Sequence, residues 1–120
     1  MAAMKDKLCL IEDDLIMGES LTHRFSLEHI DFDWYQDARS ALQGITENGY
    51  GVIVSDIRLP NMNGEELYER ILKKQKHLPP ILFITGYGSI EQAVRLLKKG
   101  AKDYITEVSQ FFGAMNIRAD

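Results

Sequence analysis

Cysteine, proline and tryptophan are all scarce in this chain of 120 residues, which holds one Cys, three Pro and one Trp. Because Cys9 has no second cysteine to pair with, a disulfide within the chain is excluded, and its place in an apolar run favours a buried, unreactive thiol. No apolar run approaches the roughly 20 residues that a membrane-spanning helix needs. Residues 1–7 are too short and too polar for a signal peptide. We therefore expect a cytoplasmic location and no membrane partner.

An excess of positive charge is missing as well, since the formal net charge is -4 at pH 7. Nucleic acids are bound mainly by Lys and Arg side chains that neutralise phosphates, so this balance predicts no direct nucleic-acid binding by the domain. The composition, 45% hydrophobic and 27% charged, is that of an ordinary globular protein. A chain of this length can bury one core, so we expect residues 1–120 to form a single domain.

What the chain does contain is a regular alternation of short apolar runs and amphipathic stretches. Strands are predicted at residues 8–11, 32–35, 52–55, 81–85 and 104–105, and the first, third and fourth runs are apolar enough for burial on both faces. The stretches between them place apolar residues at helical spacing: Met17, Leu21 and Phe25, then Ala38, Ala41, Leu42 and Ile45, then Leu67, Tyr68, Ile71 and Leu72, and finally Ile90, Ala93, Val94 and Leu97. This alternation predicts an α/β fold of the flavodoxin-like type, a doubly wound, five-stranded parallel sheet in the order 2-1-3-4-5.

Polar residues and glycines at the edges of these stripes mark the expected helix boundaries. Asp37 can cap the second helix, and Asn63 with Glu66 has the spacing of a capping box at the start of the third. Gly49 and Gly100 suit helix ends.

Carboxylates follow two of the predicted strands. Glu12, Asp13 and Asp14 come after the first strand and Asp56 after the third, and both strand ends lie where the order of the sheet reverses. Like charges gathered there need a cation or a proton, so the cluster predicts a divalent metal ion. Oxygen ligands without His or Cys favour Mg²⁺ as the cofactor. The alternative is that the first three acids only cap the following helix.

Four segments stand out at or near the predicted strand ends: residues 10–14 (LIEDD), 56–64 (DIRLPNMNG), 84–88 (ITGYG) and 100–104 (GAKDY). Together they resemble the corresponding segments of the response-regulator receiver domains of two-component systems. The resemblance covers about residues 5–106, and residues 85–93 are similar to receivers of sigma-54-dependent transcription activators. It implies a receiver fold and a phosphorylation switch, not a turnover enzyme.

The resemblance also implies roles for the matching positions. Asp56 would be the phosphoacceptor, attacking a phosphohistidine or a small phosphodonor. Asp13 and Asp56 would bind Mg²⁺ directly together with the backbone carbonyl of Arg58, and Glu12 would act through water.

Two further positions would form the switch. Thr85 would donate a hydrogen bond to a phosphoryl oxygen, and Tyr104 would move inward behind it. The implied partners are a sensor histidine kinase, an output domain outside this chain and a second copy in a homodimer. The output is expected to be transcriptional.

The end of the chain departs from the family pattern. Glu107 and Val108 stand where receivers of this family usually have Lys and Pro, so an acid replaces the base expected to reach the phosphoryl group. Residues 107–120 also lack the amphipathic pattern of the last helix, so they are expected to be an atypical tail that is truncated or altered. An alternative function is therefore open, that of a degenerate receiver acting as a phosphorylation-independent interaction module.

Overall fold

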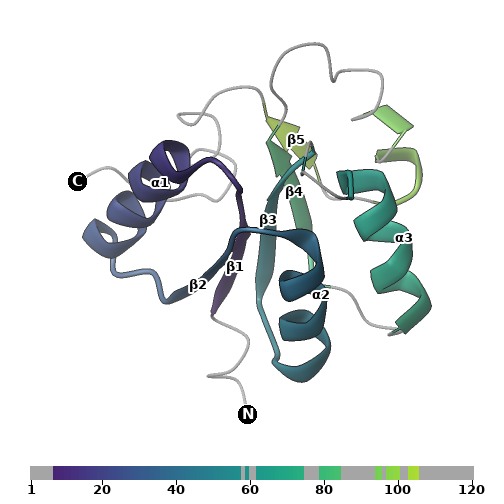
Figure 1. Cartoon of the computed structure of the whole chain (residues 1–120), viewed down its shortest axis with the longest axis horizontal. Helices are drawn as coiled ribbons and strands as arrows, with labels where there is room; N and C mark the ends of the chain where they lie inside the picture. The colour runs from purple at the N-terminus through teal and green to yellow at the C-terminus, as the bar shows by residue number, and fades with distance from the viewer. Residues whose placement is uncertain are drawn as a thin grey trace.

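The chain forms one five-stranded parallel sheet in the order β2-β1-β3-β4-β5, as predicted (Figure 1). The computed structural model describes residues 7–57, 59, 62–74, 79–84, 94–95, 97–100 and 103–105. The strands are β1 (Leu8–Ile11), β2 (Phe32–Tyr35), β3 (Val52–Asp56), β4 (Ile81–Ile84) and β5 (Asp103–Ile105). Their predicted positions are confirmed to within one residue, except that Thr85, the expected end of β4, lies outside the described residues.

Helices lie on both faces of the sheet, α1 (Leu15–Leu27) on one and α2 (Ala38–Glu47) with α3 (Gly64–Lys74) on the other (Figure 1). Their starts follow the expected capping. The carboxylate of Asp37 accepts a hydrogen bond from the Ser40 N–H at 2.8 Å, and the side-chain oxygen of Asn63 accepts one from the Glu66 N–H at 2.9 Å. Each bond satisfies a backbone donor that the first turn of a helix leaves without an intrahelical partner.

The sheet separates two apolar cores, because successive side chains of a strand point to opposite faces. On β1, Leu8 and Leu10 join the core under α1, whereas Cys9 and Ile11 join the core under α2 and α3. The first core also contains Leu21, Phe25, Val54, Leu82 and Ile84. The burial of β1, β3 and β4 on both faces is thereby confirmed.

Some expectations from helical spacing are wrong. Leu72 on α3 is 45% exposed and Val94 is 38% exposed, although both fall on predicted apolar stripes. Leu72 lies at the margin of its stripe, whereas Ile90 and Ala93, which share the stripe of Val94, lie outside the described residues. Gly49 and Gly100 both lie at helix ends, as expected, although only Gly100 has a left-handed φ, of 113°. Gly49 directly follows Asn48, the C-cap of α2, which is extended and donates its N–H to the Gly44 carbonyl.

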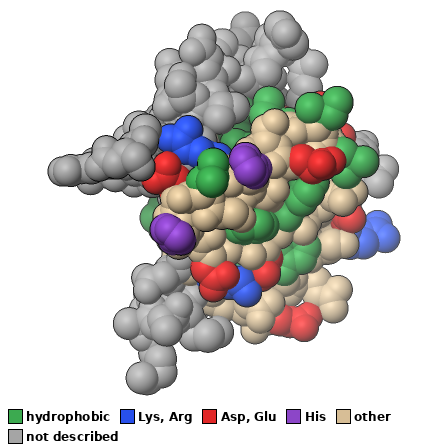
Figure 2. All heavy atoms as spheres, turned by 90° about the vertical axis from the view of Figure 1, so that its left-hand side faces the viewer, with side chains coloured by type: hydrophobic (Ala, Val, Ile, Leu, Met, Phe, Trp, Pro, Cys, Tyr) green, Lys and Arg blue, Asp and Glu red, His purple; other side chains and the backbone are tan. Residues whose placement is uncertain are grey.

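The outer surface of α1 carries more apolar residues than a solvent-facing helix side usually does. Figure 2 shows this side of the molecule, where hydrophobic side chains lie among acidic and histidine side chains. Leu15, Ile16 and Leu27 are 52%, 80% and 62% exposed, while Leu21 and Phe25 are fully buried. Apolar residues on both sides of α1 explain why its stripe is the least regular in the sequence. Over the described residues, no helix has the length and apolar character to cross a bilayer.

Candidate functional site

Three acidic side chains from two neighbouring strands meet at the carboxyl end of the sheet. β1 and β3 are paired so that Ile11 lies level with Ser55, which places the next residues, Glu12 and Asp56, side by side. One carboxylate oxygen from each of Glu12, Asp13 and Asp56 lies within 4.8 Å of the others. The predicted convergence of the two strand ends is therefore confirmed.

Glu12 is the buried member of this group, with only 2% of its surface exposed. Burial, with smaller contributions from the nearby charges of Asp56, Asp13 and Asp14, raises the pKa of its carboxyl to about 7, against a lowering hydrogen bond from the Asp14 N–H. Near neutral pH this carboxyl group is partly protonated, and a cation bound there would displace the proton to solvent.

The three consecutive acids have different tasks. The carboxylate of Asp14 accepts hydrogen bonds from the Ile16 and Met17 N–H groups at 2.9 and 3.2 Å, so Asp14 is the N-cap of α1. Glu12 and Asp13 belong to the cluster with Asp56. The alternative interpretation, that these acids only cap the helix, is correct for Asp14 alone.

The donor set fits a hard divalent cation. The group consists only of carboxylates, and it grades from buried Glu12 through half-buried Asp56 to exposed Asp13, so a partly hydrated ion could reach it from solvent. Such an oxygen-only set is what Mg²⁺ prefers, since this ion keeps several waters and takes few protein ligands. Cys9 is not a candidate metal ligand, because its thiol is buried and that burial raises its pKa.

The loop that follows Asp56 is closed by a short backbone contact. The Gly64 N–H donates to the Ile57 carbonyl at 2.6 Å, and the Ile57 N–H donates to the Ile84 carbonyl at 3.3 Å. A Cβ at Gly64 would lie 2.8 Å from a ring carbon of Phe83 and 3.1 Å from the Ile57 Cα. Glycine is thus needed for the start of α3 to approach β3 and β4 this closely.

Not every predicted site residue can be placed. Arg58 and Thr85 lie outside the described residues, as do Glu107 and Val108. Tyr104 lies on β5, where its backbone is level with Phe83 of β4. The roles predicted for Arg58, Thr85 and Tyr104 stay predictions.

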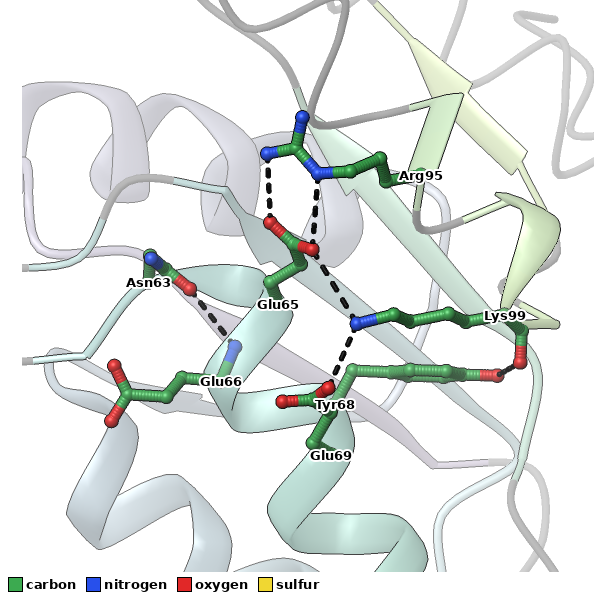
Figure 3. A network of polar contacts seen from close by, with 7 residues as sticks. All are labelled: Asn63, Glu65, Glu66, Tyr68, Glu69, Arg95 and Lys99. Atoms are coloured by element: carbon green, nitrogen blue, oxygen red, sulfur yellow. Dashed lines mark hydrogen bonds and ion pairs between the residues drawn. The ribbon is translucent and has the colours of Figure 1, made fainter.

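A second charged cluster, which sequence patterns did not indicate, joins α3 to Arg95 and Lys99 (Figure 3). The guanidinium of Arg95 donates to both carboxylate oxygens of Glu65 at 3.0 and 3.2 Å. The ammonium of Lys99 donates to Glu69 at 2.8 Å and to Glu65 at 3.4 Å. The Tyr68 hydroxyl donates to the Lys99 carbonyl at 3.2 Å. These bonds hold the segment that leads to β5 against the helix that follows the Asp56 loop.

Replacing Glu65 with Gln should lower the free energy of unfolding by about 0.5 to 1 kcal/mol, the usual range for a partly exposed ion pair. The Arg95 and Lys99 contacts lower the pKa of the Glu65 carboxyl, so its contribution is present above the unfolded-state pKa and is lost as pH falls through the folded one. Urea unfolding at low and high salt would measure this, and the deficit should shrink at high salt.

Glu66→Gln is the matched control for that prediction. Glu66 lies on the same helix and, among the described residues, forms an ion pair with Arg70 at 3.6 Å that is more exposed. Its replacement should cost a few tenths of a kcal/mol at most. Equal losses for the two variants would contradict the assignment of Glu65 as the centre of the cluster.

The sequence is similar to known signalling proteins over most of its length. Residues 8–110 match the family model described as the response regulator receiver domain. The response regulator protein FleR of Pseudomonas aeruginosa is 32% identical over 104 residues, which are 87% of this chain and 22% of that protein. The transcriptional regulatory protein FixJ of Bradyrhizobium diazoefficiens is 34% identical over 101 residues, 84% of this chain and 49% of that protein. The chain thus spans between about a fifth and a half of these relatives.

Solved structures agree with the sequence matches. The non-phosphorylated HemR receiver domain from Leptospira biflexa superposes with a TM-score of 0.82 at 30% identity. The match covers 93% of this chain and 92% of that one.

Proposed function

The chain belongs to the response regulator receiver family, and on this premise we propose that it is a phosphorylation switch in which Asp56 accepts the phosphoryl group. The observation that carries the proposal is the meeting of Glu12, Asp13 and Asp56 at one end of the sheet. A carboxylate nucleophile beside two further acids suits a reaction in which an anionic donor must be brought to an anionic acceptor.

The reaction is a single displacement at phosphorus. An oxygen of the Asp56 carboxylate forms a bond to phosphorus as the bond from phosphorus to the donor breaks, which is P–N in a phosphohistidine and P–O in a small acyl phosphate. The leaving group departs with the electron pair, and an aspartyl phosphate results. Asp56 suits this role because it is half-buried at the end of β3, where pairing with β1 and β4 fixes the strand that carries it.

Glu12, Asp13 and Asp56 would hold the Mg²⁺ ion, with the backbone carbonyl of Arg58 as a further ligand. The ion would offset the charge of the incoming phosphoryl group. Asp13 is exposed, which suits direct contact with a hydrated ion, whereas Glu12 is buried and would act through water. The short β1–α1 loop keeps both carboxylates beside Asp56.

The output of the switch would pass through Thr85 and Tyr104. Asp56 lies level with Ile84 at the end of β4, which is the residue before Thr85 in the sequence, and β5 with Tyr104 pairs with the other edge of β4. We propose that this domain acts in the cytoplasm, that a sensor histidine kinase is the donor, and that the responding output domain lies outside this chain. The part of FleR and FixJ that this chain does not cover leaves room for such a domain. Homodimerisation is a further proposed response to phosphorylation, and direct nucleic-acid binding by this domain is not expected.

Incubation with acetyl phosphate and Mg²⁺ should add one phosphoryl group, detected by intact mass spectrometry. The adduct should be absent in EDTA, because the clustered carboxylates then repel the donor, and it should be removed by hydroxylamine, which cleaves acyl phosphates. Absence of an adduct with every small donor and with phosphorylated histidine kinases would overturn the proposal.

A further inference from the structure

The backbone of Glu12 is held from β2 at both of its polar groups. Its N–H donates to the Tyr35 carbonyl at 3.0 Å, and its carbonyl accepts a hydrogen bond from the indole N–H of Trp34 at 2.9 Å. The first contact continues the ladder between β1 and β2, whereas the second is made by a side chain that lies 22 positions away in the sequence. Hydrogen bonds thus hold both the N–H and the carbonyl of Glu12, the first residue of the acidic cluster.

The indole of Trp34 is in turn held in place by α1. Gly18 is buried on the face of α1 toward the sheet, and a Cβ there would lie 2.0 Å from one ring atom of Trp34 and 2.5 and 2.7 Å from two others. The ring therefore occupies the space that any other residue at position 18 would fill. Gly18 also donates its N–H to the Asp14 carbonyl at 2.8 Å, so helix, ring and loop form one packed unit.

Residues 12–14, which join β1 to α1, are held by these contacts in addition to the constraint of a short connection. The Asp14 N–H bonds to the Glu12 carboxylate at 3.1 Å, which links the position of that carboxylate to the path of the loop. Removal of the indole donor would leave the Glu12 carbonyl without this partner and free the peptide that joins Glu12 to Asp13 to rotate.

We infer that Trp34 is a positioning residue for the cation site, acting through the Glu12 carbonyl and seated by Gly18. The inference rests on the proposed function, since it assumes that Glu12, Asp13 and Asp56 bind Mg²⁺. It goes beyond that proposal in assigning part of the site's affinity to a side chain of β2 that touches neither the ion nor the phosphoryl group.

The test measures Mg²⁺ affinity by isothermal titration calorimetry in the whole chain. Trp34→Phe removes the donor and should weaken binding about tenfold, the lower end of what loss of a supporting hydrogen bond costs a metal site. Tyr35→Phe is the matched control, because it removes the hydroxyl bond to Tyr50 at 2.7 Å from the same strand but on the other face, and keeps the Tyr35 carbonyl. The control should bind Mg²⁺ with the affinity of the parent.

A second variant separates the hydrogen bond from packing. Benzothienylalanine at position 34 has the shape of tryptophan with sulfur in place of the N–H, so it preserves the contact with Gly18 and should fold like the parent by circular dichroism. Its Mg²⁺ affinity should fall as that of Trp34→Phe does. In the parent, where Trp34 is the single tryptophan, its fluorescence should change on Mg²⁺ addition.

The outcomes distinguish the inference from its premise. Parent-like Mg²⁺ affinity in the benzothienylalanine protein would overturn the role of Trp34 and leave the proposed function intact. A parent chain that does not bind Mg²⁺ would overturn the proposed function and the inference with it. Weakened binding in Tyr35→Phe to the same extent would show a general effect of β2 and would also overturn it.

Discussion

Replacement of Asp56 with Asn should abolish phosphorylation by acetyl phosphate and at the same time stabilise the Mg²⁺-free protein. The amide has no carboxylate oxygen to form the acyl phosphate, so no adduct should appear in the intact mass. The same change removes one negative charge from a group whose carboxylate oxygens lie within 4.8 Å of one another. The loss of phosphorylation and the gain in stability of the Mg²⁺-free protein thus both follow from removal of the Asp56 carboxylate.

The size of the gain can be bounded from the charges. At about 5 Å and an effective dielectric constant near 20, two unit charges repel by roughly 3 kcal/mol. Glu12 has a pKa raised to about 7, so it carries only part of a charge at neutral pH, and Asp13 is exposed. We therefore expect the free energy of unfolding in EDTA to rise by about 1 kcal/mol, measured by urea unfolding. The added stability that Mg²⁺ gives the parent should largely disappear in the variant.

Asp14→Asn is the matched control for this prediction. It removes an acid from the same end of the sheet, but Asp14 caps α1 and asparagine is an equally good cap. The variant should still be phosphorylated and should respond to Mg²⁺. Phosphorylation of Asp56→Asn at the parent's level would refute the assignment of the acceptor, and a loss of stability in EDTA would contradict the account of the charges.

The strands and the acidic cluster could be predicted because they depend on local patterns and on topology. Runs such as residues 8–11 are too apolar to tolerate water on either face, and parallel pairing brings the carboxyl ends of neighbouring strands to one edge. Once β1 and β3 are neighbours, Glu12 and Asp56 must lie together. No detail of side-chain packing is needed for that conclusion.

Contacts that depend on three-dimensional packing could not be predicted in this way. The bond from Trp34 to Glu12 needs the register of β2 against β1 and the missing side chain of Gly18. The bond from Arg95 to Glu65 joins positions 30 apart on separate segments. A signal was present in Gly18, since a glycine within a helix costs about 1 kcal/mol relative to alanine and suggests a close approach. The partner in that approach is set only by the fold.

Replacement of Phe83 with Ala should give the largest loss of stability among these variants. Phe83 lies in β4 with 1% of its surface exposed, and its ring packs edge-on against that of Tyr68 with centroids 6.4 Å apart. It also closes over Gly64, where α3 begins. Truncation removes buried apolar surface and leaves a cavity, which together cost about 3 to 5 kcal/mol. Because a domain of this size is stable by only about 5 to 15 kcal/mol, a large part of the folding free energy would be lost.

Leu72→Ala is the control for this prediction. Leu72 belongs to the same predicted stripe on α3 as Tyr68, but it is 45% exposed, so its truncation should change the free energy of unfolding by about 0.5 kcal/mol or less. Urea unfolding of both variants, with unchanged m-values as the check on two-state behaviour, would measure the contrast. Similar losses of stability for Phe83→Ala and Leu72→Ala would contradict this prediction, because they would mean that burial does not decide how much a side chain contributes. A difference of several kcal/mol would show that contact with the sheet, more than helical spacing, decides which side chains stabilise this fold.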